Sequence, residues 1–390
     1  MMRRLGAVLG LLAGASSLAA QSCPNLFHAL LHISEADTDR HIAEVHRQLF
    51  HGDPGREAVY YPFGADAAYI ADVANRDTRT EGLSYGMMIA VQLNHPDEFA
   101  RLWRFATERL LHRDGPYQGY FAWHAGFDGR ALDAGPAPDG EEWFTTALLF
   151  AAARWHDPAY EESAQRLLHV MIHQHDRGGG SEDMFNPATH LVIFSPDRRA
   201  SGFTDPSYQL PEFYQIWADR ARDPGDRAFY RQAVVAARAA WRREANPATG
   251  LMPDYATLAG SPFRWRGRPD RFGYDAWRTL AYPALDWAWW HADGWERAQS
   301  DRVLHFLSGV GMDADRFEVD GRPVERTYSP GLWAMAAVAG QAADPDLARP
   351  FVRRLWVMAT PQGKYRYYDG MLLLLGLLET GGRFQVYGPP

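Results

Sequence analysis

The sequence predicts an all-α fold, built as a closed ring of helical hairpins. Three observations indicate it: apolar residues recur at helical spacing in twelve segments, convincing alternating strands are few, and the joints between helices are rich in Trp, Tyr, Asp and Gly. The joints favour a ring over an open α-solenoid, because a ring can gather them into one concave face of aromatic rings and carboxylates.

The clearest helix is expected over 142–155, where Phe144, Leu148, Ala151 and Trp155 fall on one stripe. The same periodicity predicts helices near 36–51, 82–94, 96–111, 158–174, 208–220, 227–244, 275–291, 295–308, 330–341, 344–358 and 369–379. Turn-rich joints separate them. Short apolar runs at 191–194 and 317–319 can pair locally but cannot build a central sheet.

Composition bounds the class of protein. With 46% apolar and 23% charged residues in 390, the chain can bury a sizeable core, and no linker or low-complexity stretch divides it, so 21–390 is expected to form a single domain. The net charge of −8 and the lack of a basic run argue against nucleic acid as a partner. We expect a monomer, although the sequence leaves the oligomeric state open.

The first twenty residues resemble a signal peptide. Arg3 and Arg4 precede an apolar stretch at 5–12, and small residues follow near Ala19 and Ala20. No later segment is apolar for long enough to span a membrane, so we expect a secreted or periplasmic protein. Cys23 is the only cysteine, which excludes an internal disulfide.

Three segments each place an acid at an expected helix start, beside glycine and aromatic residues. They are TEGLSYG at 80–86, PAPDGEEWF at 136–144 and YDAWR at 274–278. Taken singly, such an acid is usually a cap or a partner of the helix dipole. Taken together, they could supply one protonated carboxyl and one carboxylate about 6.5–9.5 Å apart, which inverting hydrolysis of a glycosidic bond requires.

In this order the segments resemble glycoside hydrolase family 8. TEGLSYGMM at 80–88 is similar to that family's segment around its general acid, and PAPDGEEWF, FTDPSYQLP at 203–211 and YDAWR are similar to its later landmarks. The resemblance is closest to the reducing-end xylose-releasing exo-oligoxylanase branch and runs from Asn25 through Gly119–Trp123 to Asp369. It implies an (α/α)6 barrel of six inner and six outer helices, acting on β-1,4-linked xylo-oligosaccharides without cofactor or metal.

The resemblance also implies roles for individual residues. Glu81 matches the proton donor, Asp275 the base that activates water, Asp139 an acid that binds and distorts the sugar, and Tyr208 a tyrosine that holds the water. Further positions expected at the substrate are Trp123, Arg278, Tyr368, Tyr328 and Ser329, and Arg278 could alternatively orient a carboxylate.

Glu81 must keep its proton near neutral pH, although a helix N-terminus favours the anion. We therefore expect at least three acids in the site, with Asp139 or Asp77 raising the pKa of Glu81. An arginine paired with Glu81, or its isolation from other carboxylates, would argue against its role.

The resemblance breaks at Tyr328-Ser-Pro330, where the branch has Leu-His-Pro closing the far side of the cleft. Three functions therefore stay open: an exo-acting enzyme, an endo-acting xylanase on β-1,4 or mixed β-1,3/β-1,4-xylan, and a secreted oligosaccharide-binding protein without turnover. His173 and His175 alternate along a helix, so we expect two unrelated surface histidines rather than a metal pair.

Overall fold

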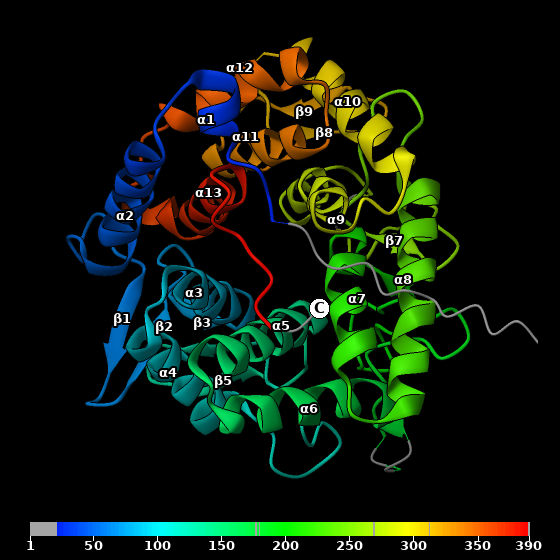
Figure 1. Cartoon of the computed structure of the whole chain (residues 1–390). Helices are drawn as coiled ribbons and strands as arrows, with labels where there is room; N and C mark the ends of the chain where they lie inside the picture. The colour runs from blue at the N-terminus through cyan, green and yellow to red at the C-terminus, as the bar shows by residue number, and fades with distance from the viewer. Residues whose placement is uncertain (1–21, 176–177, 179, 268–269, 312, 389–390) are drawn as a thin grey trace, which may run out of the picture.

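The computed structural model describes residues 22–175, 178, 180–267, 270–311 and 313–388. The expected signal segment, 1–20, lies outside these residues. Within them, two concentric sets of helices form a ring (Figure 1). The inner helices are α3 (Thr80–Leu93), α5 (Pro138–Trp155), α7 (Pro211–Arg220), α9 (Tyr282–Trp290), α11 (Pro330–Val338) and α13 (Arg366–Thr380). The outer helices are α2 (Glu35–His51), α4 (Pro96–Phe105), α6 (Pro158–His173), α8 (Pro224–Glu244), α10 (Gly294–Ser308) and α12 (Pro345–Trp356).

Successive inner helices pack side by side, except that α9 and α11 meet through the 3₁₀ turns Asp275–Leu280 and Ala339–Gln341, and α13 closes the ring against α3. A short helix, α1 (Leu26–Leu31), packs on α12. The fold is the expected (α/α)6 barrel. Inner helices such as α3 and α11 are buried almost throughout, whereas the outer helix α4 buries only one face, which explains why the outer set shows the stronger amphipathic pattern.

The two sets of helices begin differently. Five outer helices start at a side-chain cap, from Ser34, Asp157, Asp223, Asp293 and Asp344. Among the inner helices only α11, behind Ser329, has such a cap in the described structure. The inner N-termini therefore leave backbone N–H groups and the positive ends of their dipoles at one end of the barrel.

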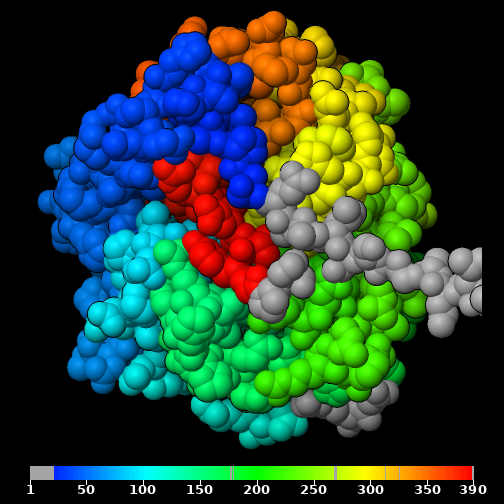
Figure 2. All heavy atoms as spheres, viewed as in Figure 1, coloured from blue at the N-terminus to red at the C-terminus, as the bar shows by residue number. Residues whose placement is uncertain are grey.

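The opposite end of the barrel is closed by the C-terminal tail, residues 381–388, which crosses the centre of the ring (Figure 2). Phe384 is fully buried and stacks on Trp289 of α9, with ring centroids 5.5 Å apart. The backbone N–H of Gln385 donates to Oε1 of Gln92 at the end of α3, at 2.9 Å. The tail thus ties the C-terminal ends of the inner helices together.

Strands are short and stay in the connections. Antiparallel pairs join β1 (Tyr60–Phe63) to β2 (Ala67–Ile70), β6 (Phe203–Thr204) to β7 (Ala256–Thr257), and β8 (Arg316–Phe317) to β9 (Pro323–Glu325), and a three-stranded sheet holds β3 (Asp77–Arg79), β4 (His124–Gly126) and β5 (Ala131–Asp133). Both apolar runs pair locally as expected, Val192 with Phe185 and Phe317 with Pro323.

Two expected helices differ from the structure. The segment 275–291 is a 3₁₀ helix over Asp275–Leu280 followed by α9, with Pro283 in the first turn of α9, where a proline is favoured. The segment 96–111 is α-helical only to Phe105 and continues as a π turn over Ala106–Leu110. None of the described helices combines the length and apolarity that a membrane crossing requires.

Candidate active site

A cavity of about 680 Å³ opens at the N-terminal ends of the inner helices. Its volume is in the range of sites that enclose a small molecule. The acids Glu81, Asp139 and Asp275 line it, each from the start of a different helix, and so do Trp123, Tyr208, Tyr367 and Tyr368. The structure therefore brings together the three acid segments that the sequence singled out.

Two glycines let the elements approach closely. A Cβ on Gly140 would lie 2.4 Å from Cβ of Thr80, so the glycine after Asp139 allows α5 to reach the start of α3. A Cβ on Gly82 would lie 2.7 Å from the ring of Tyr367, so the glycine after Glu81 makes room for that ring. The sequence patterns Glu-Gly and Asp-Gly thus have a steric reason.

Arg278 is the centre of the polar network. Its side chain is 1% exposed, and its guanidinium nitrogens lie 3.1 Å from Glu81, 3.2 Å from Asp139, 3.6 Å from Asp275 and 4.0 Å from Asp205. It also donates to the hydroxyl oxygens of Tyr85 and Ser207, each at 2.7 Å. Arg278 lies beneath the cavity lining, where it orients carboxylates, the second of the two roles expected for it.

Glu81 is held by two partners. Nη1 of Arg278 donates to Oε2 at 3.1 Å, and the hydroxyl of Tyr367 donates to Oε1 at 2.7 Å. Burial raises the pKa of Glu81; Arg278 opposes the rise and the charge of Asp275 adds to it. The source of the rise is therefore burial rather than the expected Asp139 or Asp77, and Asp77 instead pairs with Arg79 at 3.1 Å.

The ion pair between Glu81 and Arg278 is the contact that would argue against an acid role. In this site the pair does not neutralise Glu81, because one guanidinium is shared by four carboxylates. The pKa of Glu81 stays raised despite the pair. The expectation of at least three acids in the site is met.

Asp139 is buried at the start of α5, and burial raises its pKa to about 7, supported by the charges of Glu81 and Asp275 and opposed by Arg278. Its Oδ1 accepts the backbone N–H of Gly140 at 2.9 Å, which fixes the carboxyl group at the helix N-terminus. A carboxyl near half-protonation at neutral pH can both accept and donate hydrogen bonds to a polyol.

Asp275 differs from the other three acids because its side chain is 33% exposed, so water can reach it. The charge of Asp275 acts on two buried acids, Asp254 and Asp205. Burial and the charge of Asp275 raise the pKa of Asp254 to about 7, and burial followed by the same charge raises the pKa of Asp205. Asp254 accepts the N–H of Ala276 at 3.1 Å, and Asp205 caps the turn that carries Tyr208.

Aromatic side chains complete the cavity wall. The ring centroid of Tyr208 lies 5.8 Å from the guanidinium carbon of Arg278. Trp123 sits beside α3 because its carbonyl accepts the N–H of Thr80 at 2.9 Å, and Arg79 lies over its ring at 5.6 Å. Tyr368 donates to the carbonyl of Tyr274 at 2.9 Å. Such faces suit stacking on sugar rings.

Tyr328 and Ser329 do not line this cavity. Ser329 is buried, caps α11 and donates a hydrogen bond to Asp369, while Tyr328 is 48% exposed. Their expected substrate contact stays a prediction. Residues that the sequence did not single out are Tyr367, Asp205, Asp254 and Ser207; Tyr367 stood in a matched segment next to Tyr368, but nothing in the sequence ranked one above the other.

Comparison with known proteins identifies the class. The family model of Glycosyl hydrolases family 8 matches residues 68–382. The Rex8A reducing-end xylose-releasing exo-oligoxylanase of Paenibacillus barcinonensis is 41% identical over 90% of this chain and 94% of its own length. The reducing end xylose-releasing exo-oligoxylanase of Halalkalibacterium halodurans is 36% identical over 91% and 92%. The chain is therefore a glycoside hydrolase, and it belongs to glycosyl hydrolases family 8.

Solved structures agree with this assignment. Rex8A from P. barcinonensis complexed with xylose superposes with a TM-score of 0.90 at 40% identity, covering 94% of this chain and 98% of that one. A xylobiose complex of a family 8 protein from Teredinibacter turnerae gives 0.91 at 39% identity, with the same coverage.

Proposed function

We propose that this protein is an inverting glycoside hydrolase that cuts β-1,4-xylosidic bonds of xylo-oligosaccharides and releases xylose from the reducing end. The observation that carries the chemistry is the pair of acids at one mouth of the barrel, Glu81 with a raised pKa and Asp275 open to water, both within 4 Å of Arg278. The substrate class rests on the exo-oligoxylanases that the chain resembles.

The catalytic roles of Glu81 and Asp275 follow from the environments of their carboxyl groups. Glu81 gives its proton to the glycosidic oxygen as the bond to the anomeric carbon breaks. Asp275 takes a proton from the water that attacks that carbon from the opposite face, so a β-bond yields an α-sugar. Asp139 binds the sugar at the point of cleavage and supports its distortion, and Tyr208 helps to hold the water. Trp123 and Tyr368 provide stacking faces.

An endo-acting xylanase on the same scaffold is the second candidate. It is favoured by Tyr328-Ser-Pro330 in place of Leu-His-Pro, and by the likeness to a T. turnerae xylanase in complex with xylohexaose, with a TM-score of 0.90 at 38% identity. Mixed β-1,3/β-1,4-xylan belongs to this alternative.

A time course on xylohexaose separates the two candidates. Xylose and xylopentaose as first products support the exo assignment, whereas early trimers and tetramers overturn it in favour of the endo enzyme. NMR of the first product tests inversion independently of that result: α-xylose appearing before mutarotation is expected, and β-xylose contradicts the mechanism. The control is Asp66→Asn, whose 73% exposed side chain lies outside the cavity lining, and it should give the wild-type products.

We also propose that the protein works outside the cytoplasm, as a secreted or periplasmic monomer. The basic and apolar start of the sequence supports export. Sizing of the purified protein and N-terminal sequencing of the exported form, with a new terminus near residue 20 or 21, test both parts.

A further inference from the structure

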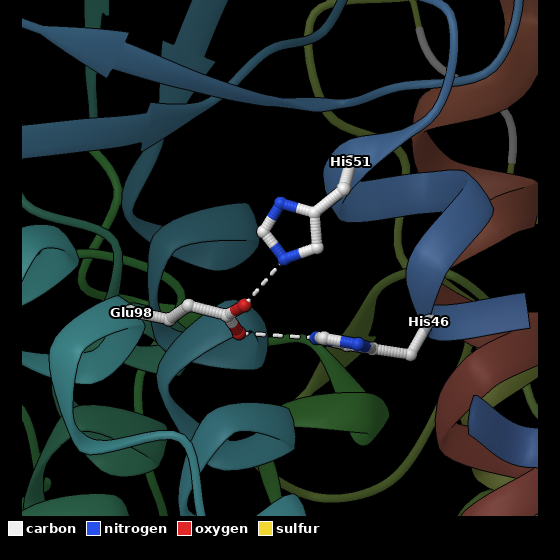
Figure 3. A group of neighbouring side chains, drawn as sticks. All are labelled: His46, His51 and Glu98. Atoms are coloured by element: carbon white, nitrogen blue, oxygen red, sulfur yellow. Dashed lines mark hydrogen bonds and ion pairs between the residues drawn. The ribbon is translucent and has the colours of Figure 1, made fainter. Parts of the chain in front are cut away.

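Outside the cavity, imidazoles gather around one buried carboxylate between two outer helices. His46 and His51 come from the last turns of α2, and Glu98 comes from the first turn of α4, just after His95 (Figure 3). The two helices are successive members of the outer set (Figure 1). Among the described residues that line the active-site cavity, none belongs to this group of side chains.

The ligand atoms already converge. Nε2 of His46 lies 3.0 Å from Oε2 of Glu98, and Nε2 of His51 lies 2.7 Å from Oε1. One ligand atom from each residue lies within 4.8 Å of the others. In Figure 3 one nitrogen of each imidazole ring faces the Glu98 carboxylate, each toward a different oxygen.

This donor set and spacing suit zinc. Two imidazole nitrogens and one carboxylate are a known tetrahedral zinc set, with bonds of about 2.0–2.2 Å that place ligand atoms about 3.3 Å apart. The two hydrogen-bonded separations, 3.0 and 2.7 Å to different oxygens of Glu98, are shorter than this spacing by about 0.3 and 0.6 Å, so the side chains must move slightly apart when an ion replaces the bridging protons. Nδ1 of His95, 3.8 Å from Oε1 of Glu98, or a water can take the fourth position.

The surroundings fix the rings and leave an entrance. The side chains of His46 and Glu98 are 6% and 10% exposed, whereas that of His51 is 51% exposed, so an ion can enter past His51. His46 stacks on Phe50 at 4.5 Å and on His95 at 4.6 Å, which holds its imidazole in place. A dication would also balance the charge of the buried carboxylate.

We propose that His46, His51 and Glu98 bind one zinc ion, which fastens α2 to α4 and has no part in hydrolysis. Our expectation of no metal came from the chemistry of bond cleavage, and this site lies apart from it. A second group, His169, His173 and Asp226, also places three ligand atoms within 4.8 Å of one another, but neither imidazole is buried as that of His46 is, because the side chains of His169 and His173 are 55% and 34% exposed. It provides the matched control.

The test is zinc binding to the full-length protein after treatment with a chelator. Competition with a chromogenic chelator measures the zinc affinity of the wild type, His51→Ala, His51→Gln and the control His169→Ala. The glutamine variant keeps a donor for Glu98 and covers the case in which alanine disturbs folding. Far-UV circular dichroism and the zinc-free Tm show whether each variant is folded.

We expect the wild type and His169→Ala to bind zinc with equal affinity at the α2–α4 site, and both His51 variants to bind at least tenfold more weakly. Zinc should raise the Tm of the wild type and not that of His51→Gln, because binding to the folded state alone stabilises it. Anomalous diffraction at the zinc edge should place the ion between His46 and Glu98. Equal zinc affinity in the wild type and the His51 variants, or no binding at about 100 µM zinc, would overturn the proposal.

Discussion

The hydroxyl of Tyr367 donates a hydrogen bond of 2.7 Å to Oε1 of Glu81, from the start of the last helix of the barrel to the start of its first inner helix. The contact joins residues 286 positions apart. It stabilises the anion of Glu81 and so works against burial, which raises the pKa of the same group. The pKa of Glu81 thus depends on the balance between burial and hydrogen bonding, and a single substitution can change it.

Removing this hydroxyl should shift the pH dependence of hydrolysis. In Tyr367→Phe the pKa of Glu81 rises, because a donor to its anion is lost, and the alkaline limb of kcat/KM moves to higher pH. The lost hydrogen bond also loosens the carboxyl group, so kcat falls by about tenfold. Tyr365→Phe, at a side chain that is 65% exposed, is the control and should leave the profile unchanged. A shift of the limb to lower pH would contradict the assignment.

Replacing the proton donor itself should nearly stop the reaction. Glu81→Gln keeps the shape of the side chain and its contact with Tyr367, but it has no proton to give, so kcat on xylotriose should fall by about 10²–10⁴. KM should change little, and the Tm should stay the same or rise. The rates of Glu81→Gln and of the control Asp66→Asn, an exposed acid outside the cavity lining, test this prediction. Hydrolysis at the wild-type rate in Glu81→Gln would remove Glu81 from its role.

Asp254 should make the protein less stable as the pH rises. Its pKa is raised to about 7, so the folded chain keeps a proton that the unfolded chain releases above about 4. The unfolding free energy therefore falls between about pH 4 and 7 and then levels off. In Asp254→Asn this fall should be smaller by up to about 4 kcal/mol, since each pKa unit corresponds to about 1.4 kcal/mol. Urea unfolding at several pH values measures it, with the 73% exposed Asp66 changed to Asn as the control.

Arg278 should be essential for stability as well as for activity. In Arg278→Met the buried acids Glu81, Asp139 and Asp205 lose their shared cation, which should reduce the unfolding free energy by about 3–5 kcal/mol near neutral pH. The loss should shrink at low pH, where these acids are protonated. Arg266→Met, at the exposed rim of the cavity, is the control. A pH-independent loss would point to packing rather than charge.

Much of the fold could be predicted because helical periodicity is a local property. The expected helix near 36–51 is α2, and that near 344–358 is α12 within two residues at each end. The acids of the site were found for a different reason, since Glu81, Asp139 and Asp275 each stand in a short segment with its own pattern. Periodicity failed where a proline or a tight joint decided the local geometry, as at 275–291.

What could not be predicted depends on contacts between distant residues. Arg278 meets Glu81 across 197 positions, and no pattern near either residue indicates that the guanidinium is shared by four acids. The cause of the raised pKa of Glu81 was misjudged because burial is a property of the folded barrel. Likewise His46 and Glu98, 52 positions apart, gave no signal along the chain. His173 and His175, expected to be unrelated to each other, contact different acids: His173 lies 2.8 Å from Asp226 of the next outer helix, and His175 contacts Asp183.

The closure of the ring has a consequence for how the molecule assembles. The first long helices, α2 and α3, pack against α13, which is among the last segments to leave the ribosome. During synthesis α2 and α3 therefore keep an apolar face exposed until α13 is available. Contacts between segments so far apart in the sequence also slow folding. The tail after α13 then covers Trp289 and seals the core. A chain that lacks only its last ten residues would carry every acid of the site and still be an unfinished, aggregation-prone barrel.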